Sequence, residues 1–329
     1  MKKRNLLLAL AGTALLLSGC TVGGKQYFGF GSVATYGDAA AYTGYHVETT
    51  VDYVAVVLQK DVIKNLRLDT VQLYSKLTEG AVVLKTEENG DVKSKWELLD
   101  DYAMKVASPI GKEWYEQAEA FENWAVGKTV EQVKAGMTGT KLTDGATIGN
   151  TINVNGWVAA LESAVAAKVE FKGKVAALGV GGLNTVSLKR NTTDVEGQDY
   201  TIGGAVFDEA KKVLAARVDT FQPRYVANEA GDRLVMDGSK VQVDATAKRV
   251  KSKQELKDDY GMKVASPIGK EWYEQAASLV DYIKGKTVSE ALGTDAKLAN
   301  GAEVGCTMNI GGYRSALLEA EHTAFNSRK

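Results

Sequence analysis

The segment KSKWELLDDYAMKVASPIGKEWYEQA at residues 93–118 recurs as KSKQELKDDYGMKVASPIGKEWYEQA at residues 251–276. The two copies differ only at positions 96, 99 and 103 of the first copy, which excludes a chance match. They lie 158 residues apart. This spacing is that of a domain, because solenoid repeats have periods of about 20–50 residues. The sequence therefore predicts an internal duplication.

The match extends on both sides of this segment. Three further pairs of stretches align at offsets of 150 to 156: Phe28–Gly31 with Leu178–Gly181, LDTVQ at 68–72 with VDTFQ at 218–222, and NTINVNGW at 150–157 with CTMNIGGY at 306–313. The second copy holds eight more residues between its VDTFQ and its KSK. We predict two tandem homologous domains, residues 28–168 and 178–324, joined by a linker at residues 169–177.

Each unit is predicted to begin with antiparallel strands. In the first unit, apolar and β-branched runs at 51–58 and 63–71 flank a turn at Lys60-Asp61. Residues 81–84 and Val92 flank Asn89-Gly90, a dipeptide typical of hairpin turns.

Helices are predicted to follow the strands. Ser108 and Pro109 suit an N-cap and a first helical position, and apolar residues recur at helical spacing from Ile110 to a stop at Gly127. Thr129 with Gln132, and Thr287 with Glu290 in the second copy, fit capping boxes of a short next helix. A strand at 147–154 and a helix at 156–167 complete the unit. The predicted class is α+β, with an antiparallel sheet and two to three helices in each domain.

The N-terminus has the features of a bacterial lipoprotein signal. Residues 2–4 are basic, residues 6–17 are apolar, and Leu17-Ser18-Gly19 precede Cys20. The apolar run has 12 residues, whereas a spanning helix needs about 20. We predict that residues 1–19 are cleaved and that Cys20 carries the lipid. Residues 20–27 would then tether an extracytoplasmic protein to the membrane.

Composition excludes several classes of function. Lys and Arg number 40 against 41 Asp and Glu, so no basic field attracts nucleic acid. Two histidines and two cysteines cannot supply a clustered Cys/His zinc site. His46 is isolated and His322 lies near the C-terminus, which leaves a Ser-His-Asp hydrolase a distant third hypothesis.

Two repeated stretches resemble motifs that bind phosphate. The stretches 127–129 and 285–287 both read Gly-Lys-Thr, but Glu122 and Val280 stand where a P-loop has its first glycine. A helix C-cap followed by an N-cap explains these stretches. The second pattern, Ser-Pro-Ile-Gly-Lys, would offer free amides, a glycine and an ammonium to an anion. Its candidate residues are Ser108, Gly111 and Lys112, with Ser266, Gly269 and Lys270 in the second copy. A plain helix cap is the alternative, and Asp100 and Asp101 nearby oppose an anion.

The third candidate is a Gly-x-Thr junction before the last helix. Thr151 follows Gly149-Asn150, and Thr307 follows Gly305-Cys306. A threonine hydroxyl beside a backbone turn suits a phosphate or a covalent attachment, although strand propensity also explains the threonine.

This junction resembles the extracytoplasmic FMN-binding domains, in which a Ser-Gly-Ala-Thr segment precedes the last helix and its threonine carries FMN. The whole unit is similar to bacterial membrane-anchored lipoproteins called major membrane immunogens, which are placed beside those domains. The residues that carry this resemblance in both copies are Asp69–Gln72, Asp100–Met104, Ser108–Trp114 and Gly127–Thr129. A rival match to the attachment segment is Asp144–Thr147, whose counterpart ends in Glu303.

Two hypotheses about function remain, one with a flavin cofactor and one without. The resemblance implies FMN in each unit, with Thr151 or Thr307 near the phosphate and a redox partner at the cell surface; the flavin would supply the chemistry. Alternatively, the units are cofactor-free surface modules for a small molecule, a peptide or a protein partner. If both elements serve one ligand, the Ser-Pro-Ile-Gly-Lys segment and the Gly-x-Thr junction must meet in space.

Overall fold

The structure is a computed structural model that describes residues 24–39, 44–79, 81–86, 92–186, 190–191, 194–195 and 198–326. The predicted signal peptide, Cys20 and the predicted turn at Asn89-Gly90 lie outside these ranges. Within them, no helix is both long and apolar enough to cross a membrane.

The first sheet is an antiparallel meander, as predicted. Its strands are β1 (Gln26–Asp38), β2 (Val47–Gln59), β3 (Val62–Thr78) and β4 (Ala81–Leu84). Lys60 and Asp61 form the β2–β3 turn, with φ values of 51° and 63°. The predicted linker contributes a strand of its own, β7 (Val169–Phe171), which pairs with the start of β1.

The second sheet repeats three of these strands. It consists of β8 (Ala177–Val186), β11 (Gln198–Phe207) and β12 (Val213–Phe221), all antiparallel. The longer second copy adds short strands: β9 (Arg190–Asn191), β10 (Asp194–Val195), β13 (Tyr225–Ala227), β14 (Leu234–Met236), β15 (Val243–Asp244) and β16 (Arg249–Val250). Of these, β16 pairs with β1 through Ala34 and Val250, so part of the second half extends the first sheet.

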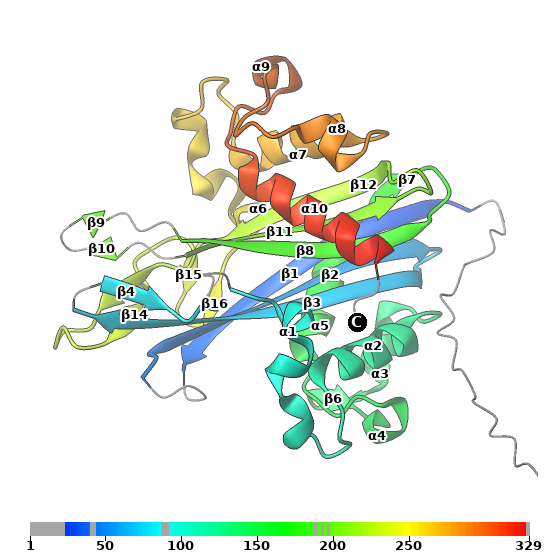
Figure 1. The fold of residues 1–329 in the computed structure, drawn as a ribbon, viewed down its shortest axis with the longest axis horizontal. Coiled ribbons are helices and arrows are strands. Elements are labelled where there is room, and N and C mark those ends of the chain that lie inside the picture. The colour runs from blue at the N-terminus through cyan, green and yellow to red at the C-terminus, as the bar shows by residue number, and fades with distance from the viewer. Residues whose placement is uncertain are drawn as a thin grey trace, which may run out of the picture.

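Helices cover the outer face of each sheet (Figure 1). Those of the first half are α1 (Lys95–Leu98), α2 (Trp114–Ala125), α3 (Val130–Ala135), α4 (Gly145–Ile148) and α5 (Asn155–Ala166), with a short hairpin β5 (Met137–Thr138) and β6 (Lys141–Leu142). Those of the second half are α6 (Lys253–Leu256), α7 (Trp272–Ile283), α8 (Val288–Leu292), α9 (Gly301–Val304) and α10 (Gly311–Phe325). The predicted capping boxes at Thr129 and Thr287 are present.

The two sheets pack face to face, which gives four layers in the order helices, sheet, sheet, helices (Figure 1). The central core joins Phe28, Phe30 and Tyr53 of the first sheet to Val180 and Ile202 of the second. Separate cores lie between each sheet and its own helices. The two halves therefore share a buried hydrophobic interface and are not connected by the linker alone.

Glycines on the inner strands let helix backbones approach the sheets closely. A Cβ atom on Gly31 would lie 2.2 Å from the backbone nitrogen of Ala164 in α5. A Cβ atom on Gly181 would lie 2.4 Å from the carbonyl oxygen of Ala316 in α10. This contact explains why the Gly-containing stretches at the start of both sequence copies align.

Two local predictions are wrong. The long helix does not begin at Ser108-Pro109: α2 begins at Trp114, with Glu113 as its N-cap in a capping box with Glu116. Gly111 has φ +62°, a left-handed conformation that no α-helix contains, so the segment before Glu113 is a turn.

The predicted strand at 147–154 is also absent. Residues 145–148 form the short helix α4, and Gly149 ends it with φ +94°. The backbone amides of Gly149 and Asn150 both donate to the carbonyl of Gly145, each at 2.8 Å. The chain therefore turns sharply before α5 and cannot pair as a strand.

Candidate ligand-binding site

The two segments that sequence analysis singled out do meet, and the side chain of Gln117 lies between them. Gln117 in α2 is fully buried. Its Nε2 donates to Ser108 Oγ at 3.1 Å and to the Lys112 carbonyl at 3.2 Å. Its Oε1 accepts from the Thr151 backbone amide at 2.9 Å and from Thr151 Oγ1 at 3.3 Å. One carboxamide thus joins the Ser-Pro-Ile-Gly-Lys turn to the Gly-x-Thr junction.

The second half repeats this arrangement with Gln275. Its Nε2 donates to Ser266 Oγ at 3.0 Å and to the Lys270 carbonyl at 3.2 Å, while Oε1 accepts from the Thr307 amide at 2.8 Å. Because the glutamines already satisfy these polar groups, an anion at either junction would have to bind beside the carboxamide and not in its place.

The lysines of both turns reach the glycines of both junctions. The Lys112 ammonium lies 2.6 Å from the point where Gly149 would carry a Cβ atom, and Lys270 lies 2.5 Å from the same point on Gly305. The glycines of the turns themselves, Gly111 and Gly269, are exposed and have open space around them. Lys112 is therefore the charged group that the fold brings toward Thr151.

The two junctions differ at the residue before the threonine. Asn150 is fully buried; its Nδ2 donates to the Gln117 carbonyl at 2.9 Å, and its Oδ1 has no partner among the described residues. Its counterpart is Cys306, a buried thiol whose pKa burial raises to about 11. Only the first half thus keeps a buried polar group with spare hydrogen-bonding capacity beside the threonine.

A cavity of about 570 Å³ opens next to the first junction. Ile152 and Asn153, which directly follow Thr151, line it together with the buried indoles of Trp114 and Trp157. This volume lies within the usual range for small-molecule sites, about 300–1,000 Å³, and such sites combine aromatic walls with a few placed polar groups.

A chain of hydrogen bonds crosses the cavity wall. Trp157 Nε1 donates to Thr70 Oγ1 at 3.0 Å, and Thr70 Oγ1 donates to Asp52 Oδ1 at 2.5 Å. The Asp52 carboxylate packs against Gly156 at the N-terminus of α5. Burial raises the pKa of Asp52. The Asp52 carboxylate is therefore a hydrogen-bond acceptor in the cavity wall, and a ligand that donates to it would favour its ionised form.

Lys95 supplies a cation to the same cavity. It is 9% exposed, and its ammonium lies 4.7 Å from the ring centroid of Tyr102 and 5.7 Å from that of Trp114. Lys253 repeats this arrangement in the second half, with 4.7 Å to Tyr260 and 5.7 Å to Trp272. Cation–π contacts of this kind hold a lysine at a fixed place within an aromatic wall.

Asp52, Thr70 and Lys95 are site residues that were not expected from the sequence. The one signal for Lys95 was its place in the nearly identical segment, because its burial is visible only in the structure. Asp52 alternates with apolar residues along a strand and resembles a solvent-facing residue in the sequence.

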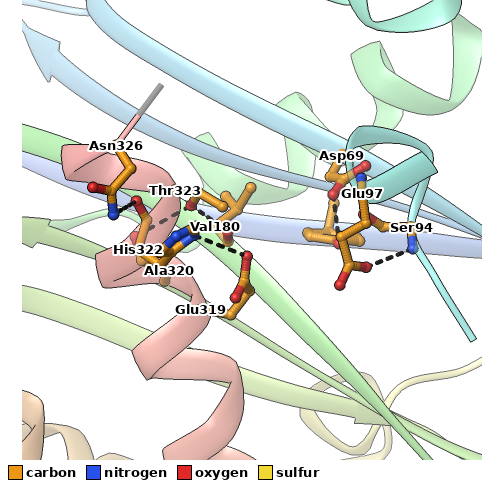
Figure 2. A network of polar contacts seen from close by, with 10 residues as sticks. Asp69, Ser94, Glu97, Val180, Glu319, Ala320, His322, Thr323 and Asn326 are labelled. Atoms are coloured by element: carbon orange, nitrogen blue, oxygen red, sulfur yellow. Dashed lines mark hydrogen bonds and ion pairs between the residues drawn. The ribbon is translucent and has the colours of Figure 1, made fainter. Parts of the chain in front are cut away.

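A second cavity, of about 200 Å³, lies between the two halves and has an acidic lining (Figure 2). Asp69 and Glu97 approach it from the first half, and Glu319 and His322 from α10. Tyr53 Oη donates to Asp69 Oδ2 at 3.1 Å. The carboxylates that line this second cavity would repel a phosphate. The larger cavity next to the Thr151 junction is therefore the better candidate for an anionic ligand. The described residues contain no cluster of His, Cys, Asp or Glu suited to a metal ion.

Asp219, the counterpart of Asp69, predicts a pH dependence of stability. Burial raises its pKa from 3.8 to about 6, although its carboxylate accepts hydrogen bonds from the amides of Thr220 and Gln254. Its folded-state pKa exceeds the unfolded value, so its contribution is full below pH 3.8 and is lost as the pH rises through 6. At 1.36 kcal/mol per pKa unit, we expect a loss of about 3 kcal/mol.

Urea unfolding at pH 4 and pH 7 tests this expectation. The fall in unfolding free energy between these values should be about 2 kcal/mol larger for the native chain than for Asp219→Asn, which cannot titrate, because the unfolded carboxyl is already partly ionised at pH 4. Equal falls in the two proteins would contradict it.

No protein-family model matches the chain, and no solved structure matches it. A chlorophenol reductase of Desulfitobacterium hafniense is 32% identical over 103 residues, which is 30% of this chain and 30% of the relative. The match thus spans less than a third of that relative's length.

Proposed function

We propose that this chain is a membrane-anchored, extracytoplasmic lipoprotein of two tandem homologous units, and that the cavity of its first unit binds FMN for electron transfer. The observation that carries the proposal is the 570 Å³ cavity, where indoles, a buried lysine and a half-buried aspartate converge. Its lining residues Ile152 and Asn153 directly follow Thr151. Similarity to a protein named as a reductase supports a redox role.

The residues present fit a flat ligand that carries an anion. Trp114 and Trp157 offer apolar ring surface, and Lys95 and Asn153 offer donors to the polar edge of a ring. Asp52 offers an acceptor when ionised. Lys112 and the buried Asn150 lie beside Thr151, where the phosphate would be held. Bound FMN would supply one- and two-electron chemistry, and the protein would fix its position and exclude water.

The absorption spectrum of the purified mature chain tests this proposal. After coexpression with a flavin-attaching enzyme, we expect visible flavin bands, and we expect Thr151→Ala to lower the flavin occupancy. Thr307→Ala is the matched control, because Cys306 replaces the asparagine beside it. Flavin bands of equal height in Thr151→Ala would reject this threonine as the attachment point, and a colourless native protein would reject FMN.

The buried lysines provide a second, independent pair of variants. Lys95→Met should lower flavin occupancy about tenfold, because a charge-assisted hydrogen bond contributes about 1.5–3 kcal/mol. Lys253→Met removes a lysine of the same burial and the same aromatic contacts from the other half. Lys253→Met should therefore lower the unfolding free energy as much as Lys95→Met does. It should leave the flavin occupancy unchanged. Equal losses of flavin in both variants would contradict a site in the first half.

The alternative, a cofactor-free binding module, is favoured by one observation. Gln117 and Gln275 already satisfy the polar groups that a phosphate at each junction would use. Under this alternative, the native chain shows no visible absorption even after coexpression, and Lys95→Met changes only stability.

A further inference from the structure

An ion pair joins α2 to β3 in the first half and has no counterpart among the described residues of the second half. Arg67 Nη1 lies 2.9 Å from Glu122 Oε2, and Glu122 is 2% exposed. The other carboxylate oxygen, Oε1, accepts from the backbone amide of Leu68 at 2.8 Å. One carboxylate on α2 thus serves both a guanidinium and an amide on β3.

The second half keeps the arginine and loses the carboxylate. Arg217 on β12 aligns with Arg67, but Val280 on α7 stands where α2 has Glu122. Arg217 makes two long hydrogen bonds, to the Ala167 carbonyl at 3.3 Å and to Gln254 Oε1 at 3.4 Å, and forms no ion pair with any described residue. Burial lowers the pKa of its guanidinium. Val280 also offers no acceptor to the amide of Val218, the counterpart of Leu68.

A cavity of about 300 Å³ lies where the carboxylate is lost. Arg217, Val218 and Val280 line it together with the rings of Phe28 and Tyr273. Asp281 and Lys284 also line it and pair with each other at 2.5 Å. The carboxylate that attracts Arg217 is the buried Asp219, whose charge raises the pKa of the guanidinium although the two groups form no ion pair. The cavity is therefore mainly apolar, with one underused guanidinium in its wall.

We propose that this cavity binds a small molecule with a carboxylate on an apolar body. The carboxylate occupies the place that Glu122 fills in the first half and accepts from the Arg217 guanidinium and the Val218 amide. A planar guanidinium matches a carboxylate through two parallel hydrogen bonds. The apolar body packs against Phe28 and Tyr273. This site is separate from the proposed flavin cavity and uses none of its residues.

Titration calorimetry of the full mature chain with benzoate tests the proposal. Benzamide, which has the same shape without the charge, is the ligand control, and inorganic phosphate tests an anion without an apolar body. We expect benzoate to bind and benzamide and phosphate to bind at least tenfold more weakly. Phosphate binding as tight as benzoate, or equal binding of benzamide, would overturn the proposal.

Two substitutions locate the site. Val280→Glu restores the carboxylate of the first half inside the cavity, so it should abolish benzoate binding while the protein melts no lower than the native chain. Arg217→Gln should weaken benzoate binding at least tenfold. Val106→Ser, at an exposed position in the first half that does not line this cavity, is the control for both. Native affinity in Val280→Glu, with an unchanged circular dichroism spectrum, would show that benzoate binds elsewhere.

Discussion

Replacing Gly31 with valine is expected to destabilise this fold by at least about 3 kcal/mol. A Cβ atom at this position would lie 2.2 Å from the Ala164 nitrogen and 2.5 Å from the Ala160 carbonyl oxygen, and both are backbone atoms of α5 that no rotamer change can move. Overpacking a core typically costs about 1–3 kcal/mol. Displacing a whole helix from its sheet lies at or above that upper limit, against a total stability of about 5–15 kcal/mol.

Gly37→Val is the matched control, because Gly37 lies on the same strand and a Cβ atom there meets nothing within 4 Å. Chemical denaturation should place the Gly31→Val midpoint far below that of Gly37→Val, or show no folded baseline at all. Equal midpoints would mean that α5 does not pack on β1 as described.

The same strand shows how far the sequence predicts the fold. Side chains alternate between the faces of a strand, so the pattern Phe-Gly-Phe-Gly at 28–31 places its rings on one face and its glycines on the other. The structure puts Phe28 and Phe30 in the core between the sheets and packs the glycines against α5. The alternation predicts which residues share a face of the strand. It does not predict the partner of each face, because the helix under the glycines lies about 130 residues away in the chain and the strand under the rings about 150.

The wrong helix start has a local physical reason. Proline is favoured at the first turn of a helix but also in turns, and the rule cannot separate the two uses. The reciprocal bonds of Glu113 and Glu116, together with the left-handed Gly111, decide in favour of a turn at Pro109. A capping box that begins with glutamate is outside the usual Ser/Thr pattern.

The candidate site was predictable in part. The duplicated turn and junction marked the two segments that meet, because both recur in the same order in each half. Gln117 was not predictable, since a glutamine on an amphipathic helix resembles a solvent-facing residue until its partners are known. Asp52 was missed for the same reason, because its burial depends on the position of α5.

Replacing Cys20 with alanine is expected to release the protein from the membrane. In the proposed maturation, the Cys20 sulfur carries a diacylglycerol, which holds the chain through two acyl chains. Each buried methylene contributes about 0.8 kcal/mol, and stable anchoring requires two such signals. After removal of residues 1–19, 37 basic residues remain against 41 acidic, so the net charge of −4 gives no attraction to an anionic lipid surface. No helix in the described ranges can replace the anchor by spanning the bilayer.

Fractionation of cells that express Cys20→Ala, with mass spectrometry of the N-terminus, distinguishes the sources of membrane attachment. We expect the native chain in the detergent phase, starting at a lipid-modified Cys20. Cys306→Ala is the control: its thiol is buried with a raised pKa, so it is neither accessible nor a ready nucleophile, and its loss should leave attachment unchanged. If Cys20→Ala is extracted by detergent as fully as the native chain, with residues 1–19 still present, the uncleaved apolar segment holds the protein at the membrane and the lipid does not.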